Sequence, residues 1–299
     1  MQVRSSRETL QTPTQLDTRF GAVAGLYVAT LVSPALLFVA MQWLNLDSEL
    51  VVLGLLGAVG MTLTAAVAWQ VTCWGGLVAW FNSPWVAFLV TSVGILPMFA
   101  YAFQAFVYIA ITVADLQAES TASFVGFIGF FLGFVACCLG SVLVPMARTR
   151  LVNATVDASE VDTEWTAGWP RQDRFKLVIG ALVIVGVSYA LAFWQLGLQG
   201  VTMAGATGTI PMVGIHSLAS ERTYRVTPVG LEQRREARWV ESRQLRLWSQ
   251  FDGFSVTDRA IILHRQLPHF DIRCSRRDLI DDDQDVIAAL ETHLDRQDS

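Results

Sequence analysis

The sequence predicts a multi-span α-helical membrane bundle followed by a small C-terminal α+β domain. Hydrophobic residues make up 53% of the 299-residue chain and charged residues only 16%, against about 25% charged in ordinary soluble domains. Four windows, residues 20–46, 50–114, 120–147 and 177–220, contain no Asp, Glu, Lys or Arg. A helix needs about 20 apolar residues to cross the hydrocarbon core, so these windows hold several crossings. From residue 221 onward the hydrophobic period changes to that of strands.

The first domain is predicted to contain five spans within residues 20–199. The apolar run after the polar tail 1–19 is longer than the ~7–15 residues of a signal-peptide core, so we read it as a retained span. Ser83 and Pro84 form a helix start, and Pro34 and Pro97 are expected to kink their spans. The expected spans are residues 20–44, 50–73, 84–113, 122–146 and 177–196, with a shallow turn at 73–82.

The distribution of basic residues predicts which ends of these spans face the cytoplasm. Basic residues precede the first span and flank the connection between the fourth and fifth, whereas the other connections carry only acids. Loops rich in Arg and Lys stay cytoplasmic, and four crossings between the two groups fit one common side. The basic residues are Arg4, Arg7, Arg19, Arg148, Arg150, Arg171, Arg174 and Lys176.

Residues 200–220 leave the side of the C-terminal domain open. The segment 200–219 is uncharged but rich in Gly and Thr, with Pro211 and His216 inside it. We take it as a linker, which places the C-terminal domain outside the cell. A weak sixth span remains the alternative, and it would return the domain to the cytoplasm.

Residues 221–299 are predicted to fold as a curled antiparallel sheet closed by one helix. Apolar residues alternate in several short segments separated by turn signals such as Asp252-Gly253 and Pro268, as in half-buried strands. The final segment has apolar residues on one helical stripe. The alternating residues are Tyr224, Val226, Leu245, Leu247, Phe270, Ile272 and Cys274, and the stripe is Val286, Ile287, Leu290 and Leu294.

The segments YRVTPVGL, LWSQFDGFSVTDRAIILHR and IRCSRRDL, with the final helix, resemble the bacterial pleckstrin-homology-like (PH-like) domain of YcxB-like membrane proteins. The resemblance covers residues 222–294 and its motifs mark a fold without naming a catalytic residue. It implies a first strand at YRVTPVGL, a cytoplasmic location and an adaptor role. The matching positions are Tyr224, Val226, Thr227, Gly230, Leu231, Trp248, Phe251, Leu263 and Arg265.

An arginine cluster is the first candidate binding site. Residues 222–277 carry twelve Arg and six acids, whereas residues 278–299 carry eight acids and one Arg. Arginine suits bidentate contact with phosphate, so the cluster is a candidate for anionic lipid headgroups or an acidic partner. The alternative is a solvated sheet face neutralised by the acidic tail. The candidate residues are Arg234, Arg235, Arg238, Arg243 and Arg246.

The acidic run LIDDDQDV has the D-x-D-x-D spacing of a calcium loop at Asp281, Asp283 and Asp285. Such a loop also needs Gly at its sixth position and an acid at its twelfth, where this chain has Val286 and Thr292. The run is instead typical of a helix start, with acids at the positive end of the helix dipole. No metal site and no cofactor are predicted.

A stripe of glycines in the fourth span is the remaining candidate site. Small residues at helical spacing let helices approach closely, so the stripe serves either packing within the chain or homodimerisation. Its members are Gly126, Gly129, Gly133 and Gly140.

These patterns favour a non-enzymatic membrane protein whose PH-like domain is an adaptor for a protein or for an anionic lipid surface. The spans contain no ionisable acid or base of the kind that proton relays need. The four cysteines show no ligand or disulfide pattern. A small-solute channel or transporter regulated by the domain is the alternative, and an enzyme ranks lowest. The expected partners are the bilayer, a protein and a second copy of the chain, but no nucleic acid.

Overall fold

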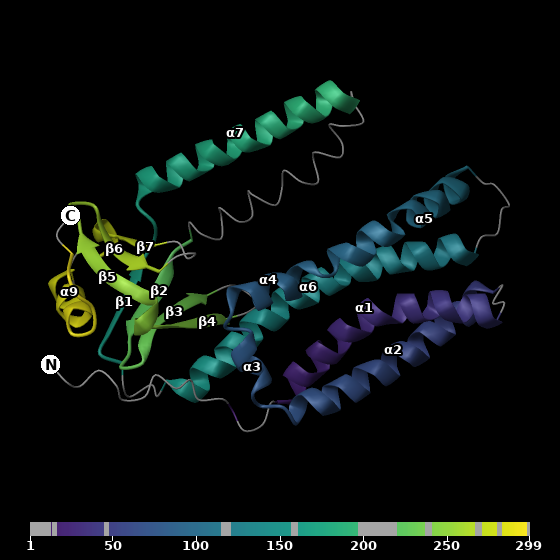
Figure 1. Ribbon diagram of the computed structural model, residues 1–299, viewed down its shortest axis with the longest axis horizontal. Helices are drawn as coiled ribbons and strands as arrows, with labels where there is room; N and C mark the ends of the chain where they lie inside the picture. The colour runs from purple at the N-terminus through teal and green to yellow at the C-terminus, as the bar shows by residue number, and fades with distance from the viewer. Residues whose placement is uncertain are drawn as a thin grey trace. The chain divides into compact units, whose positions relative to one another are not determined.

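The computed structural model describes Pro13 and residues 17–44, 48–114, 121–156, 161–196, 220–236, 241–266, 271–279 and 283–297 (Figure 1). The described residues fall into two compact units. The helical unit runs to Thr155 and also takes in residues 241–244. The sheet unit contains residues 156–236 and 245–297.

Five helical stretches in the described part of the chain are long and apolar enough to cross a membrane, in agreement with the five predicted positions. They are Thr18–Met41, Glu49–Thr72, Pro84–Val113, Thr121–Thr155 and Arg171–Leu191. The helical unit consists of α1 (Thr18–Leu44), α2 (Glu49–Thr72), the short α3 (Leu77–Trp80), α4 (Pro84–Ser92), α5 (Ile95–Val113) and α6 (Thr121–Thr155). The remaining long helix, α7 (Arg171–Leu196), belongs to the sheet unit.

The third span is broken between α4 and α5 at Gly94, not at Pro97. Pro97 lies in the first turn of α5, where its missing N–H costs little. A Cβ on Gly94 would lie 2.4 Å from the carbonyl oxygen of Gly133 in α6. The break therefore falls where two backbones meet. As predicted, α4 begins at Pro84, although the Ser83 side chain makes no capping hydrogen bond.

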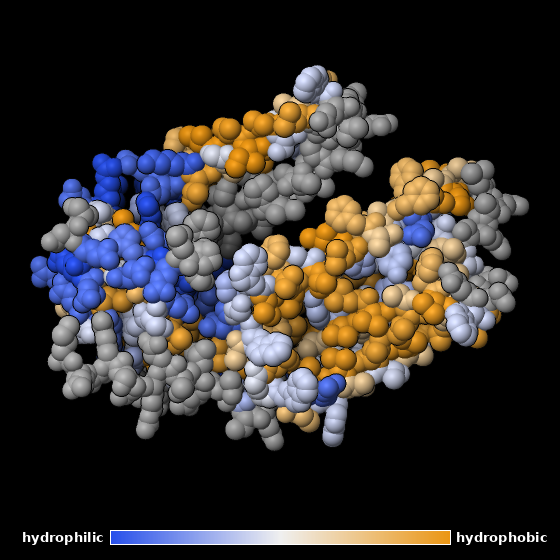
Figure 2. Space-filling view, viewed as in Figure 1, coloured by the Kyte–Doolittle hydropathy of each residue, from blue (hydrophilic) through white to orange (hydrophobic). Residues whose placement is uncertain are grey.

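Large apolar side chains cover the outside of the long helices (Figure 2). Trp43, Trp69 and Phe99 are 82%, 77% and 78% exposed. Soluble monomers rarely expose contiguous apolar patches larger than a few hundred Å². Such a surface is unusual for a soluble monomer and is consistent with helices that cross a membrane.

The sheet unit contains two antiparallel sheets in the described residues, with strand orders β1-β2-β3-β4 and β5-β6-β7. Helix α9 (Asp283–Glu291) follows the last strand, as predicted for a closing helix. The strands are β1 (Thr163–Ala167), β2 (Arg222–Val226), β3 (Gly230–Glu236), β4 (Glu241–Leu247), β5 (Phe251–Val256), β6 (Ala260–Arg265) and β7 (Ile272–Ser275), with the short 3-10 helices η2 (Trp248–Gln250) and η3 (Arg276–Asp278).

The sequence pattern did not predict β1, which precedes α7 and lies inside the range assigned to the membrane domain. β1 pairs antiparallel with β2, with Trp165 opposite Tyr224. The segment TEWTA alternates, so that Trp165 and Ala167 are buried while Glu164 and Thr166 face outward. The Trp165 and Tyr224 rings stack with centroids 5.6 Å apart. The strand that was expected to come first in this domain is therefore the second.

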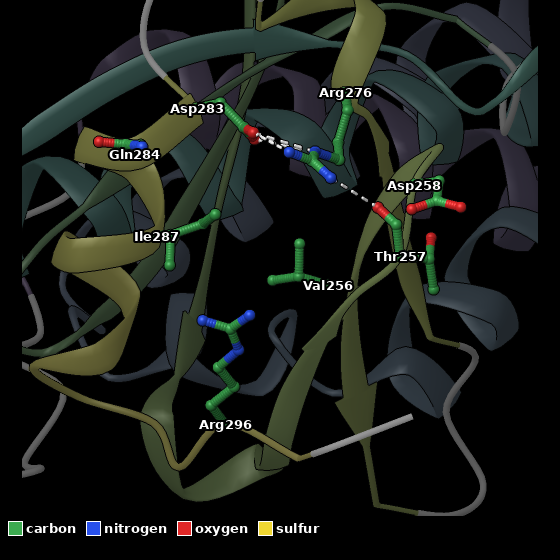
Figure 3. A pocket seen from close by; sticks show the side chains of 8 residues that line it. All are labelled: Val256, Thr257, Asp258, Arg276, Asp283, Gln284, Ile287 and Arg296. Carbon is green, nitrogen blue, oxygen red and sulfur yellow. Dashed lines mark hydrogen bonds and ion pairs between the residues drawn. The ribbon is translucent and has the colours of Figure 1, made fainter.

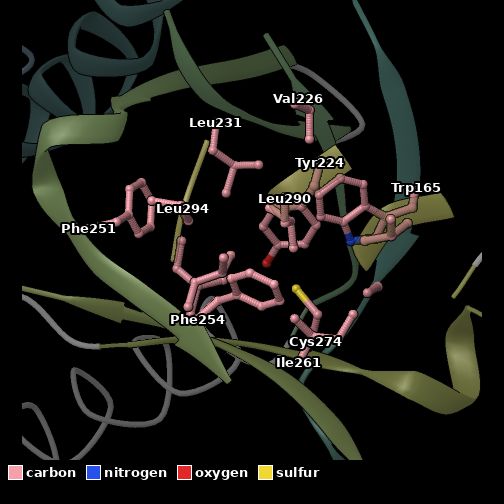
Figure 4. Close-up of a cluster of buried hydrophobic side chains, with 14 of the residues drawn as sticks. Trp165, Tyr224, Val226, Leu231, Phe251, Phe254, Ile261, Cys274, Leu290 and Leu294 are labelled. Atoms are coloured by element: carbon pink, nitrogen blue, oxygen red, sulfur yellow. The ribbon is translucent and has the colours of Figure 1, made fainter. Parts of the chain in front are cut away.

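One apolar core joins both sheets and α9 (Figure 4). Burial raises the pKa of the Cys274 thiol in this core to about 12, so the thiol is unreactive near neutral pH. The core residues are Trp165, Ala167, Tyr224, Val226, Leu231, Trp248, Phe251, Phe254, Ile261, Leu263, Ile272, Cys274, Leu279, Val286, Leu290 and Leu294.

The turn between β2 and β3 accounts for several positions of the PVGL and Trp motifs. Thr227 Oγ1 donates to the Gly230 carbonyl oxygen at 2.6 Å, and the Trp248 indole donates to the Thr227 carbonyl at 2.9 Å. A Cβ on Gly230 would lie 2.2 Å from the Arg246 carbonyl oxygen. These residues hold β2 and β3 in register, so we interpret the motif as structural.

Candidate functional site

The candidate arginines of the predicted binding site, here called the hairpin arginines, do not form an open basic patch in the described residues. They are Arg234, Arg235, Arg238, Arg243 and Arg246. Arg234, Arg235 and Arg246 are half-buried on β3 and β4 and are engaged by neighbouring groups. Arg243 lies against α6: its backbone N–H donates to Thr149 Oγ1 at 3.2 Å, and its guanidinium donates to the Asn153 side chain. Arg238 lies outside the described residues.

Oppositely charged residues lie at neighbouring cross-strand positions in the first sheet, where Glu232 of β3 is fully buried. Arg225 on β2 forms an ion pair with Glu164 on β1 at 2.9 Å, and its other cross-strand neighbour is Glu232 on β3. Opposite charges at such cross-strand positions contribute roughly 0.2–1 kcal/mol each. Part of the arginine excess is therefore balanced within the sheet by Glu164 of β1, and not by the acidic tail that the sequence interpretation invoked.

The start of α7 is bound to the second sheet. Asp173 in the first turn of α7 pairs with Arg273 on β7 at 2.9 Å. The Arg259 guanidinium, just before β6, donates to the Gln172 side-chain oxygen at 2.5 Å. The first turn of α7 is therefore fixed to the sheet domain by two side-chain contacts.

Gly168, the residue after β1, adds further contacts. The Gly168 N–H donates to the Asp278 carboxylate at 2.9 Å, and the Gly168 carbonyl accepts from the Ser275 N–H at 2.9 Å. β1, the start of α7, β7 and η3 thus form one connected corner of the domain.

Four basic side chains at this corner are exposed: Arg171 and Lys176 on α7, Arg259 before β6 and Arg277 in η3. We call this surface the α7 foot. The sequence analysis used Arg171 and Lys176 only to predict the orientation of the spans. It did not predict that Arg259 and Arg277 would lie near them. The alternation in TEWTA could have revealed β1, whose pairing with β2 brings the start of α7 next to the sheet.

A pocket of about 450 Å³ opens between the β5–β6 turn, η3 and α9 (Figure 3). The Arg276 guanidinium pairs with Asp283 and donates to the Thr257 carbonyl at 3.0 Å. Hydrogen bonding to Asp283 raises the pKa of Arg276. Arg296 at the other wall is 3.4 Å from Glu291. Both arginines of the pocket therefore already have acidic neighbours.

The acidic run ends in a helix, as predicted: α9 begins at Asp283, with Asp285 also in its first turn. Asp281, the first acid of the D-x-D-x-D spacing, lies outside the described residues. Within the described ranges, no group of three or more His, Cys, Asp or Glu side chains is placed to hold a metal ion.

Ser255, His264 and Asp271 form a hydrogen-bonded chain in the order of a nucleophilic triad. Ser255 Oγ is 2.9 Å from His264 Nε2, and His264 Nδ1 is 3.4 Å from Asp271. However, Ser255 is only 4% exposed, and neither it nor His264 lines the described pocket. Asp271 also accepts the Arg265 N–H at 3.1 Å. These hydrogen bonds connect β5 and β6 to Asp271, the residue before β7. We therefore interpret them as contacts that stabilise the fold.

The glycine stripe of α6 packs within the chain. Added Cβ atoms would lie 2.1 Å from Gln104, 2.5 Å from Tyr101, 2.7 Å from the Gly94 carbonyl and 2.4 Å from the Val90 carbonyl. All four partners lie in α4, α5 or the break between them. The stripe is therefore covered by the same chain. Its members, in the same order, are Gly126, Gly129, Gly133 and Gly140.

One polar cluster joins the start of α1 to the last part of α6. Asp17 accepts the Phe20 N–H at 2.7 Å at the start of α1 and pairs with Arg150 near the end of α6. Burial alone would raise the pKa of Asp17, but the Phe20 N–H and Arg150 together hold it below its usual value. The start of α1 and the end of α6 therefore lie at the same end of the helical unit.

The fold and these contacts define a class: helices of membrane-spanning length joined to a two-sheet domain closed by one helix. Comparison with protein-family models, curated proteins and solved structures gives no match. The resemblance to the YcxB-like PH-like domain stays a prediction.

Proposed function

We propose that this chain is a multi-pass membrane protein that holds a non-enzymatic interaction domain, the sheet unit, at the cytoplasmic face. The exposed apolar surface of the long helices supports insertion into a bilayer. The sheet domain acts as an adaptor at that face. Two contacts in the chain support this choice of side.

The first contact is the pairing of Asp17 with Arg150. It joins the start of α1 to the end of α6, with four candidate spans between them. Both ends therefore face one side, as the basic residues predict, and the Arg-rich connection makes that side cytoplasmic. The chain passes from the end of α6 to β1 without another candidate span.

The second contact carries the proposal: β1 precedes α7, yet it pairs along its whole length with β2, which follows α7. Two strands of one sheet lie on the same side of a membrane. If α7 crosses once, the chain must cross back before Ser220. This favours the sixth span over the linker, although residues 197–219 lie outside the described residues. The sheet domain is then cytoplasmic, together with β1.

Labelling with a membrane-impermeant maleimide tests this arrangement. Single cysteines replace the exposed Glu164, Asp258 and Ser48 in a chain whose Cys73, Cys137 and Cys138 are changed to Ser. The buried Cys274 stays silent because its pKa is raised. We expect S48C, between α1 and α2, to be labelled in intact cells, and E164C and D258C only after permeabilisation. Labelling of D258C in intact cells with E164C still protected would place β1 and the β5–β6 turn on opposite sides of the membrane and refute the proposal.

A further inference from the structure

The α7 foot, defined above as Arg171, Lys176, Arg259 and Arg277, is the most open basic surface of the sheet unit in the described residues. Of the nearby acids, Asp173 pairs with Arg273, whereas Asp278 accepts the Gly168 N–H and keeps its negative charge. Asp258 beside Arg259 and Asp278 beside Arg277 are both exposed, so the four basic side chains of the foot face two exposed carboxylates. The foot therefore keeps a positive balance that its own contacts do not cancel.

The foot lies where the polar and apolar parts of α7 meet. Phe175, 66% exposed, begins the apolar surface of the helix, about one turn, or roughly 5–6 Å, after Arg171. Lys176 can extend along the helix and keep its ammonium group in the polar layer. This is the level at which lipid headgroups surround a membrane span.

The sheet residues are held at the same level as this turn. Arg259 donates a hydrogen bond to the side chain of Gln172 in the first turn of α7. Arg277 lies in η3 next to Asp278, whose carboxylate holds Gly168 just before the helix. The contacts bring arginines from two distant parts of the sequence beside the two cations of the helix.

We propose that the α7 foot binds the headgroups of anionic phospholipids in the cytoplasmic leaflet, so that the second sheet lies against the membrane surface. This inference rests on the proposed membrane insertion and names the partner of the sheet domain. Guanidinium groups form paired hydrogen bonds with phosphate oxygens. Each basic residue near an anionic surface strengthens binding by roughly fivefold. In contrast, the described arginines of β3 and β4 are half-buried and engaged: Arg234, Arg235, Arg243 and Arg246.

Hydrogen exchange of the full chain in nanodiscs tests the lipid contact. The probes are discs of phosphatidylcholine and discs with about 30% phosphatidylglycerol, read at residues 257–261 and 275–279. We expect exchange at both segments to slow by at least about fivefold in the anionic discs, and the difference to disappear near 1 M salt, where the screening length is about 3 Å. Equal exchange in both lipids would overturn the inference.

Two variants separate a lipid contact from a general change in the fold. Replacing Arg171, Arg259 and Arg277 together by Gln removes three charges and should abolish the difference. Replacing the same residues by Lys keeps the charges and should preserve most of it, since a lipid surface also attracts Lys. Slowing that persists in the Gln variant, or that free glycerol phosphate produces in neutral discs, would contradict lipid binding. Maleimide labelling of E164C and D258C reads sidedness independently, so a failed lipid contact leaves the proposed topology standing.

Discussion

Changing Trp165 to Ala is expected to lower the free energy of unfolding of the sheet unit by about 3–5 kcal/mol. Trp165 is 4% exposed and stacks on Tyr224 in the core shared by both sheets and α9. Removing the indole leaves a cavity at the pairing of β1 with β2. The measurement is urea-dependent pulse proteolysis of the full chain in detergent, with fragments assigned to residues 220–297.

Thr166 provides the matched control on the same strand. Its side chain is exposed and reaches only Thr223 Oγ1, at 3.1 Å, so we expect Thr166→Ala to cost no more than about 1 kcal/mol. If Trp165→Ala were as mild as Thr166→Ala, β1 would not belong to the core of the C-terminal domain.

The second large effect concerns the boundaries of the domain. A fragment of residues 221–299 lacks β1, and with it Trp165, Ala167 and the backbone hydrogen bonds between β1 and β2. We expect this fragment to be unfolded or aggregated, because the uncovered β2 edge and the exposed Tyr224 invite association. Circular dichroism and size-exclusion chromatography measure the outcome.

A protein in which β1 is joined directly to the C-terminal residues provides the matching test, because it restores what the fragment lacks. Ala167 lies opposite Arg222 in the register, so a short glycine-containing turn from Gly168 to Glu221 can replace α7 and the residues after it. We expect residues 161–168 joined in this way to residues 221–297 to give a folded monomer. A folded, stable 221–299 fragment, or an unfolded joined chain, would contradict the assignment of β1.

The sequence predicted the features that depend on local pattern. Uncharged runs marked all five long helices, and alternation around Tyr224 and Ile272 marked strands. The start of α4 at Pro84 also followed from local chemistry. These features need only residues close together in the chain, which is why periodicity and charge suffice.

The remaining features depend on contacts between distant residues. β1 has only five residues, and its partner lies beyond α7, with Thr166 and Thr223 57 residues apart. No local period encodes such a pairing. The α7 foot was missed for the same reason, since Arg259 meets Gln172 only after β1 joins the sheet. The break at Gly94 likewise depends on the approach of α6.

Disulfide crosslinking in native membranes tests the pairing of β1 with β2 most directly. Thr166→Cys and Thr223→Cys place two thiols on paired residues whose hydroxyl oxygens are 3.1 Å apart, a geometry that antiparallel neighbours can bridge. A protease site inserted after Leu196 separates the two halves of the chain. We predict that oxidation keeps the halves joined on a non-reducing gel, whereas T223C alone or the off-register pair T166C with R225C does not. Halves that separate after oxidation of the T166C and T223C chain would contradict the pairing, and with it the cytoplasmic position of the sheet domain.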